Sequence, residues 1–389
     1  MKVSMLCMRF PPAPGGTENH VLELGRELVR RGHEVNVFTS DMYCDTPLVK
    51  RRAYPSMFAG GVKRFTAYTL PGEADYPFYP GLGLPVLGDE SDVVHSHGYG
   101  AFHTLLHPLV GKLRGRKLVF TLHFHPDFSD WGGSRRLGLR KAFDRWLGPL
   151  STAAADDIIV HTAQEKSMAA SFGLIPESAR VHIVPSGIDI ERFSRRPEHG
   201  FRERFGIGPS EKIVLYVGRV AQKKGLEFLL ECAPIVLSRF PEVRFVVAGE
   251  DMGLGKRMAN EARKRGLGDR FLVTGPLDDE CLVSAYYSCE LLVLPSEYEA
   301  FGLVLAEAMA CGRPCVASRV GGVPEVVDDG RTGILVPPRD SSSLAEAIST
   351  ILSDPVQGQK MGEAGRAKAV REYSLERMTD RILAIYERD

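Results

Sequence analysis

The chain has 389 residues, with 44% hydrophobic and 25% charged side chains, which is ordinary for a globular protein. Lysine plus arginine and aspartate plus glutamate each total 49, so the overall charge does not favour nucleic acid as a partner. Seven cysteines, an odd number without a CxxC pair, argue against a disulfide framework and against a zinc ribbon. No run approaches the ~20 apolar residues that span a bilayer, and no proper signal peptide is present, so we expect a cytoplasmic protein.

The first half of the chain alternates short apolar runs with amphipathic stretches. Residues 2–7 predict a strand ahead of a Pro/Gly loop, and residues 17–31 predict a helix with apolar side chains at helical spacing. Buried, almost unalternating strands joined by helices indicate a parallel sheet with helices on both faces. Further strands rich in β-branched residues are expected at 34–39, 92–97, 117–123 and 156–162.

Residues 184–212 interrupt this rhythm with prolines, glycines and mixed charges, so we expect a domain linker there. The pattern then restarts, which predicts two α/β domains, residues 1–184 and 185–372, that face a cleft. Because ligands of open α/β sheets bind outside the carboxyl ends of the strands, functional residues should directly follow strands. The second domain should contain strands at 212–218, 244–250, 270–275, 290–296 and 314–319, and helices at 227–238 and 301–311.

The first motif is Gly15-Gly16-Thr17-Glu18, between the first strand and the first helix. Two glycines allow close backbone approach to a ligand, and Thr17 can cap the helix. The N–H groups and the dipole at a helix start attract anions, which would suit a diphosphate. The motif lacks the spacing of the dinucleotide and Walker loops, so a simple capped turn remains an equal interpretation.

The second motif, residues 218–225 (GRVAQKKG), directly follows a strand. It places Arg219 and Lys224 where a guanidinium can grip phosphate oxygens and an ammonium can add a point charge. A departing diphosphate needs such cations when no metal is present. The alternative interpretation is a solvated basic loop.

The third and most specific motif is residues 299–307 (EAFGLVLAE), in which two carboxylates are eight residues apart. Glu299 should lie in the loop after a strand, where it can reach a sugar hydroxyl. Glu307 should lie about two turns into the next helix, where it can accept hydrogen bonds from ribose hydroxyls. The alternative, two solvated glutamates beside a buried helix, is disfavoured by the strand–loop–helix context and by the small residues Ala300 and Gly302.

Taken in order, these motifs resemble those of the family 4 glycosyltransferases. The match extends through the linker entry at 184–189 (VPSGID) to residues 321–340 (GGVPEVVDDGRTGILVPPRD), so it covers nearly the whole chain. The resemblance implies the GT-B fold, in which two Rossmann-like α/β/α domains with parallel sheets face a central cleft. It also implies that residues 373–389 form a C-terminal helix that crosses back to the first domain.

The resemblance further implies a retaining transfer from a nucleotide-diphosphate sugar, with a UDP- or GDP-sugar as substrate, no cofactor and no metal. Arg219 and Lys224 would clamp the diphosphate, and Glu299 would hold the transferred sugar. His123 would lie near the reacting centre, although Phe124 stands where many relatives have Asp. The donor-binding residues implied by the match are Gly15, Gly16, Arg219, Lys224, Gly275, Leu277, Glu299, Phe301, Gly302, Leu303 and Glu307.

The first domain also contains several histidines near strands. His-x-His at 95–97 could indicate zinc, but no acidic or cysteine partner has metal-ligand spacing. We therefore expect His95, His97 and Tyr99 to line the acceptor side, or simply to pack there, rather than to bind a metal.

Residues 135–149 combine arginines with leucines and Trp146, which is typical of an interfacial helix on an anionic membrane. The alternative is a solvated helix that packs its apolar side on the sheet. The first interpretation predicts a peripheral protein at the inner face of the membrane, with a lipid-linked, glycan or small polar acceptor.

Two other classes of function remain open. One is a different enzyme of the same fold, such as a sugar-nucleotide epimerase, which would release nucleotide without an acceptor. The other is a non-catalytic sugar-nucleotide sensor, which is disfavoured because Arg219, Lys224, Glu299 and Glu307 are all retained.

Overall fold

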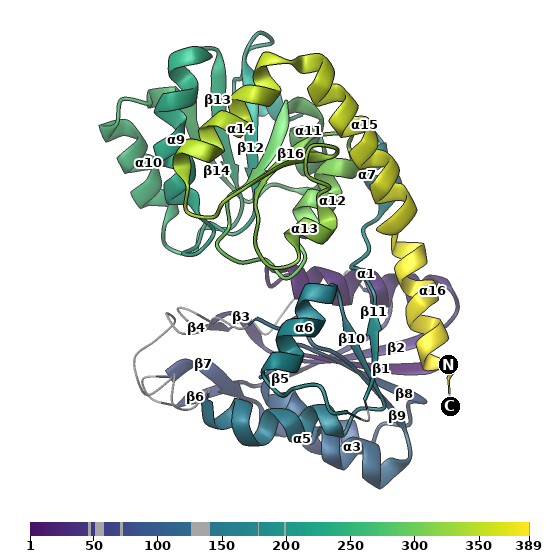
Figure 1. The fold of residues 1–389 in the computed structure, drawn as a ribbon. Coiled ribbons are helices and arrows are strands. Elements are labelled where there is room, and N and C mark those ends of the chain that lie inside the picture. Colours follow the sequence, from purple (N-terminus) through teal and green to yellow (C-terminus); the bar gives the residue numbers. More distant parts are fainter. Residues whose placement is uncertain are drawn as a thin grey trace. The chain divides into compact units, whose positions relative to one another are not determined.

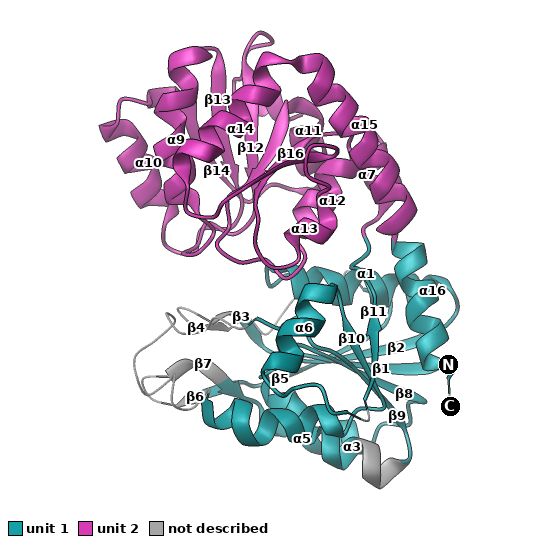
Figure 2. Ribbon diagram, viewed as in Figure 1, with its two compact units in different colours: residues 1–187, 375–389 teal, residues 188–374 magenta. Residues whose placement is uncertain are grey.

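The computed structural model describes residues 1–45, 48–50, 58–70, 73–125, 141–177, 179–197 and 200–388. The chain forms two compact units (Figure 2). Unit 1 comprises Met1–Gly187 together with Leu375–Asp389, and unit 2 comprises Ile188–Ser374. The chain therefore passes between the units twice, after residues 187 and 374, where the sequence placed the boundaries at 184 and 372.

Unit 1 is built on a seven-stranded sheet in which every pairing is parallel (Figure 1). The strand order is β11-β10-β9-β8-β1-β2-β5. Because parallel strands share one direction, their carboxyl ends meet at one edge of the sheet. The bounds are β1 Lys2–Cys7, β2 Glu34–Ser40, β5 Gly61–Phe65, β8 Val93–His97, β9 Lys117–Thr121, β10 Asp157–Val160 and β11 Arg180–Ile183.

Side chains alternate between the two faces of this sheet, and both faces are covered. On β1, Met5 packs with α1 and α16, whereas Leu6 packs on the opposite face with α2 and α3. The sheet is therefore the middle layer of an α/β/α sandwich. The helices of unit 1 are α1 Gly16–Arg30, α2 Gly83–Leu87, α3 His107–Arg114, α5 Gly148–Ala153, α6 Ala163–Ser171 and α16 Leu375–Tyr386, with short turns η1 Pro80–Leu82, η2 Phe102–Leu106 and η3 Phe143–Leu147.

Two small antiparallel pairs lie in the region from residue 43 to residue 87, where the sequence showed no interpretable pattern. They are β3 (Met42–Asp45) with β4 (Leu48–Lys50), and β6 (Tyr68–Leu70) with β7 (Glu73–Phe78). Their sequences (MYCD, LVK, YTL and EADYPF) lack the longer apolar, β-branched runs by which the buried strands were recognised.

Unit 2 contains a six-stranded, wholly parallel sheet in the order β14-β13-β12-β15-β16-β17. Its strands are β12 Lys212–Val217, β13 Val243–Ala248, β14 Phe271–Gly275, β15 Leu291–Leu294, β16 Cys315–Ser318 and β17 Gly333–Val336. The helices are α7 Ile190–Ser194, α8 Phe201–Arg204, α9 Leu226–Arg239, α10 Gly255–Lys264, α11 Asp279–Ser288, α12 Leu303–Ala310, α13 Val323–Val326, α14 Ser341–Ser353 and α15 Pro355–Glu372, with the turn η4 Gly268–Arg270.

Helices cover both faces of this second sheet as well. Four consecutive residues of β12, from Ile213 to Tyr216, are each 0% exposed although neighbouring side chains point to opposite faces. Two parallel sheets with helical layers confirm the α/β class predicted from the sequence. The sequence missed β5, β11 and β17 of the two main sheets, and it did not recognise the short helices α7 and α8 within residues 184–212.

The C-terminal helix α16 belongs to unit 1, as its place in the sequence resemblance implied. It packs beside α1 on the sheet, and the hydroxyl of Tyr386 lies 2.6 Å from His95 Nδ1, at the middle of the sheet. The backbone N–H of Gly187 donates to Met378 Sδ at 3.0 Å, which fixes the start of α16 beside the first crossing. The chain end is therefore part of the core of unit 1.

Among the residues that the structure describes, no helix combines the length and the apolar character needed to cross a bilayer. Cys7, Cys232, Cys281, Cys289, Cys311 and Cys315 are free and buried.

We predict that Tyr386→Phe destabilises unit 1, because it leaves a buried ring nitrogen of His95 without its partner. The loss should be about 1–3 kcal/mol in the free energy of unfolding. Urea denaturation measures it, with Tyr68→Phe as the matched control because Tyr68 is 50% exposed. Equal stability of the two variants would show that the bond to His95 does not stabilise the docked helix.

Candidate active site

Two loops at the carboxyl edge of the unit 2 sheet, those after β12 and β15, are in direct contact with each other. The loop after β12 ends at Gly225, where an added Cβ would lie 1.9 Å from the Pro295 carbonyl oxygen. The N–H of Glu297 donates to the Lys223 carbonyl at 2.9 Å. Lys223 itself has a φ of 65°, an unusual backbone conformation for a residue with a side chain. Only glycine fits at 225, and its close approach brings the basic loop against the end of β15.

This contact brings together two of the predicted residues, Lys224 and Glu299. Lys224 Nζ lies 2.6 Å from Glu299 Oε1, and the Ser296 hydroxyl donates to the same oxygen at 2.8 Å. The side chains of the ion pair are 21% and 16% exposed, so both charged groups are mostly buried but still accessible to a ligand. The arrangement gives a fixed ammonium and a fixed carboxylate at one strand end, which suits recognition of a polar, partly anionic ligand.

The loop after β16 holds Glu299 from its backbone side. The Gly322 N–H donates to the Glu299 carbonyl at 2.9 Å, and a Cβ at Gly321 would lie 2.0 Å from the same oxygen. Gly321 also has a φ of 48°. Gly321 therefore permits an approach that no larger residue would allow, and the Gly322 N–H holds the backbone that carries the carboxylate.

Helix α12 begins directly after this carboxylate. Gly302 occupies the position before the helix with a φ of 87°, and no side chain caps the helix start. The helix begins at Leu303, two residues later than the sequence predicted, so Phe301 and Gly302 form the turn that precedes it. The first N–H groups of a helix have no partner within the helix and attract anions. Phe301 is buried and packs edge-on against Tyr373, which anchors the turn.

Glu307 lies farther along α12 and is partly buried. The Tyr286 hydroxyl donates to Glu307 Oε2 at 2.6 Å, and burial raises the pKa of this carboxyl above its ordinary value. Within the described part of the chain, Oε1 accepts no hydrogen bond. Tyr286 therefore orients the carboxylate and leaves one of its oxygens for a ligand.

The other predicted residues of unit 2 also lie at strand ends. The Arg219 side chain is half-buried, and the Arg219 carbonyl accepts a hydrogen bond from the Tyr216 hydroxyl at 3.0 Å, which fixes the backbone of the loop. Gly275 ends β14 with a φ of 76°, and its carbonyl accepts from the Gly249 N–H. Leu277 packs its side chain on the core, so any ligand contact of this residue would come from its backbone.

In unit 1, Gly15 and Gly16 lie at the start of α1, as expected. The helix begins at Gly16, with Gly15 before it and no side-chain cap. The prediction that Thr17 caps the helix is therefore wrong, because Thr17 lies within the first turn. Glu18 occupies that turn and pairs with Arg9 at 2.7 Å, so its charge beside the helix start is compensated.

The sequence suggested that His123 is the last residue of a strand. The strand β9 instead ends at Thr121, so His123 lies in the loop that follows it. Its φ of 45° is a backbone conformation that few residues with a side chain adopt. The buried carboxylate of Glu165 accepts from the backbone N–H of Phe124 and from that of His161, each at 2.7 Å. This carboxylate joins the loops after β9 and β10 and positions His123 and His161.

The three residues predicted on the acceptor side are buried. His95 is 0% exposed, and its second ring nitrogen contacts the Thr121 hydroxyl at 2.7 Å, so both nitrogens have partners. His97 is 1% exposed, and its ring lies 4.0 Å from that of His95. Tyr99 donates to Asp144 at 2.8 Å and packs against Phe124. The contacts of His95 and Tyr99 stabilise the fold, and their predicted role towards an acceptor stays a prediction.

Sequence reasoning missed several residues that the structure places beside the predicted ones. Ser296, Tyr286, Glu165 and His161 hold predicted side chains or loops in place, and His20 approaches His123 to a ring distance of 5.0 Å. The rule that functional residues follow strands would have selected His161, because it directly follows β10. No local signal singles out His20, which lies within α1.

Two Rossmann-like units with wholly parallel sheets, each carrying its candidate residues at the strand ends, define the GT-B fold of glycosyltransferases. Two family models match the chain: "Glycosyltransferase Family 4" over residues 14–192 and "Glycosyl transferases group 1" over residues 199–368. The chain belongs to glycosyltransferase family 4, and it is a glycosyltransferase.

Individual proteins similar to this chain support the assignment. The D-inositol 3-phosphate glycosyltransferase of Geodermatophilus obscurus is 31% identical over 401 residues, which cover 96% of this chain and 84% of the relative. Sucrose-phosphate synthase from Thermosynechococcus elongatus has a TM-score of 0.77 at 26% identity, covering 99% of this chain and 98% of that one. Anabaena HepE, solved in complex with UDP and glucose, shares the fold with a TM-score of 0.77 at 20% identity and 99% coverage of both chains.

We predict that Glu299→Ala lowers sugar transfer by about 100-fold or more, because it removes the carboxylate that Lys224 and Ser296 orient. The far-ultraviolet spectrum should stay unchanged, since the backbone contacts of residue 299 remain. Glu227→Ala is the matched control, because this exposed carboxylate lies in the first turn of α9, close to the same loop. Turnover of Glu299→Ala near that of the control would remove Glu299 from the site.

Proposed function

We propose that the protein transfers a hexosyl unit, with retention of configuration, from a nucleotide-diphosphate sugar to a glycan, lipid-linked or small polar acceptor. The single observation that carries the proposal is the Lys224–Glu299 pair, 2.6 Å apart, beside the uncapped start of α12. A cation, a carboxylate and helix amides at one strand end match the phosphate and the hydroxyls of such a donor.

In this proposal the cations act on the leaving group. Arg219 and Lys224 stabilise the negative charge that develops on the departing diphosphate, and the amides of Phe301, Gly302 and Leu303 add dipoles of the same sign. Because these groups are held by backbone contacts, they need little reorganisation during the reaction. This arrangement supplies the charge stabilisation without a metal ion.

The two carboxylates hold the hydroxyls of the donor. Glu299 accepts from the transferred sugar, and Glu307 accepts from the ribose through Oε1, since Tyr286 occupies Oε2. The backbone near Gly275 and Leu277 holds the base. UDP is the favoured nucleotide, because Anabaena HepE of the same fold was solved in complex with UDP and glucose.

Retention follows most simply from attack on the face that the diphosphate leaves. A double displacement needs a carboxylate nucleophile on the opposite face of the sugar, and we assign no residue to that role. The departing phosphate oxygen instead takes the proton of the acceptor hydroxyl, while Arg219 and Lys224 hold the diphosphate in place.

We predict that UDP, more than GDP or ADP, raises the melting temperature of the protein, with or without EDTA. A ligand at 100 times its dissociation constant adds about 2.7 kcal/mol to the free energy of unfolding. A thermal-shift series at increasing nucleotide concentration measures this effect. Glu307→Ala should weaken the response to UDP, whereas Glu227→Ala should leave it intact.

Two outcomes of this series, and one outcome of a turnover assay, would contradict the proposal. Absence of any nucleotide response would argue against a nucleotide-sugar donor. A response that appears only with added metal and disappears with EDTA would argue against metal-free binding. Release of nucleotide from the sugar at the same rate with and without acceptor would indicate an epimerase.

We also propose that the protein is cytoplasmic and contacts the inner face of a membrane through the segment predicted at 135–149. Residues 135–140 lie outside the described residues. The rest of the segment exposes Trp146 to 66%, and Leu150 just beyond it to 60%, with the Arg145 guanidinium over the Trp146 ring. Exposed apolar side chains beside a cation suit the interface of an anionic bilayer.

We predict that the protein co-sediments with vesicles that contain anionic phosphatidylserine at low salt, and less with pure phosphatidylcholine vesicles. Trp146→Ser with Leu150→Ser should lower the bound fraction several-fold, because both changes remove exposed apolar surface. Phe172→Ser is the control, since Phe172 is 44% exposed elsewhere on unit 1. Equal binding of the double variant and the control would exclude this segment as the contact.

A further inference from the structure

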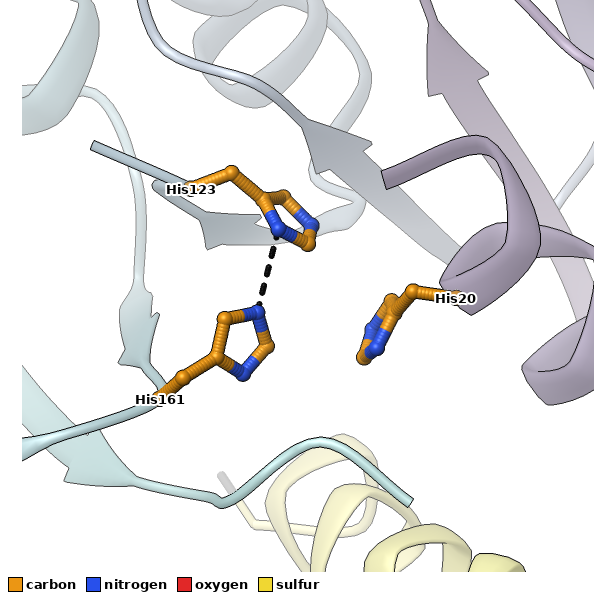
Figure 3. A group of neighbouring side chains, drawn as sticks. All are labelled: His20, His123 and His161. Atoms are coloured by element: carbon orange, nitrogen blue, oxygen red, sulfur yellow. Dashed lines mark hydrogen bonds between the residues drawn. The ribbon is translucent and has the colours of Figure 1, made fainter. Parts of the chain in front are cut away.

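Three histidines from three separate elements of unit 1 converge on one point (Figure 3). His20 comes from the second turn of α1, His123 from the loop after β9, and His161 from the residue after β10. Their ring centroids are 4.6–5.0 Å apart, and one ring nitrogen of each lies within 4.8 Å of those of the other two. These histidines are far apart in sequence, so it is the fold of unit 1 that brings them together.

Three of the six ring nitrogens in this cluster have no hydrogen-bond partner among the described residues. His20 is 3% exposed, yet neither of its ring nitrogens has a hydrogen-bond partner among the described residues. The Nε2 atom of His123 is likewise buried and without a partner in the described part of the chain. Buried polar atoms are almost always paired, and an unpaired one destabilises the fold. A metal ion that accepts the lone pair of one His20 nitrogen would remove part of this penalty.

The orientation of His161 directs a lone pair into the cluster. Its Nδ1 lies 3.0 Å from the Val184 carbonyl oxygen and 3.2 Å from the Ser186 hydroxyl. The carbonyl can only accept, so Nδ1 carries the proton and Nε2 presents its lone pair to His123. Histidines that bind metals commonly donate their second N–H to a carbonyl in this way.

One spacing in the cluster fits a tetrahedral ion, and the three ligand atoms all lie within 4.8 Å of one another. His161 Nε2 and His123 Nδ1 are 3.1 Å apart. Two nitrogens bound to tetrahedral zinc at about 2.0–2.1 Å are separated by roughly 3.3 Å.

We propose that His20, His123 and His161 bind one divalent transition-metal ion of the zinc class, with a fourth position open to water or another ligand. The sequence argument against a metal considered only the local His-x-His pair, whereas these ligands come from three distant elements. Glu165 completes the site as a positioning residue, since it fixes the backbone at His161 and at Phe124. The cluster belongs to unit 1, whereas the charged residues proposed to hold the donor, Arg219, Lys224, Glu299 and Glu307, belong to unit 2.

The test uses the full chain without a histidine tag and Co²⁺ as a visible probe. We expect about one Co²⁺ per chain, with the intense visible absorption of tetrahedral coordination, and displacement by Zn²⁺. His20→Phe should lower the affinity by more than about 100-fold, because it removes one of three ligands. The variant should fold, since the substituted ring has no nitrogen partner in the described protein.

His33→Ala is the matched control, because it removes a histidine that lies three residues beyond the end of α1, the helix that carries His20. It should bind Co²⁺ like the unaltered chain, and His161→Phe should lose binding like His20→Phe. The proposal is overturned if the unaltered chain shows no tetrahedral absorption, or if His20→Phe and His161→Phe both retain it. UDP binding is measured on the same variants, so a failure of the donor proposal would appear separately from a failure of metal binding.

Discussion

The burial of both faces of two parallel sheets is the constraint on which the rest of the molecule depends. Consecutive residues of β12, such as Val214 and Leu215, are fully buried on opposite sides, so the strands themselves can carry little chemistry. Polar and charged groups are therefore concentrated in the loops beyond the strand ends. The fold thus determines where a site can form before any particular residue type is considered.

Within that constraint, glycines decide how closely the loops of unit 2 approach. Gly225 and Gly321 stand where a side chain would overlap backbone oxygens of neighbouring loops. The resulting contacts bring Lys224 to Glu299 and hold the carboxylate from its backbone side. A transferase that stabilises a leaving diphosphate benefits from such fixed charges, because preorganised groups need not move as the charge develops.

In unit 1, backbone contacts also fix the loops at the strand ends, but these loops carry histidines instead of an ion pair. Glu165 is a buried carboxylate that joins two loops through backbone N–H groups, and these loops carry His123 and His161. The helix α1 adds His20, so the strand-end region gathers imidazoles rather than ion pairs. The docking of α16 through His95 shows that neighbouring histidines serve the fold as well, so burial alone does not distinguish a structural histidine from a ligand.

The sequence by itself determined the parallel α/β class, most strand positions and the motifs around Arg219 and Glu299, because periodicity and strand-end placement are local properties. The C-terminal helix, expected at 373–389 and found at 375–386, followed from the family resemblance. Only the tertiary structure decided that Lys224 pairs with Glu299, that Tyr386 reaches His95, and that His20 meets His161. These contacts join residues that are 75 to 291 positions apart in the chain. They depend on strand order and on the approach of loops. No local pattern encodes that order, since strands next to each other in the sheet need not be neighbours in the chain.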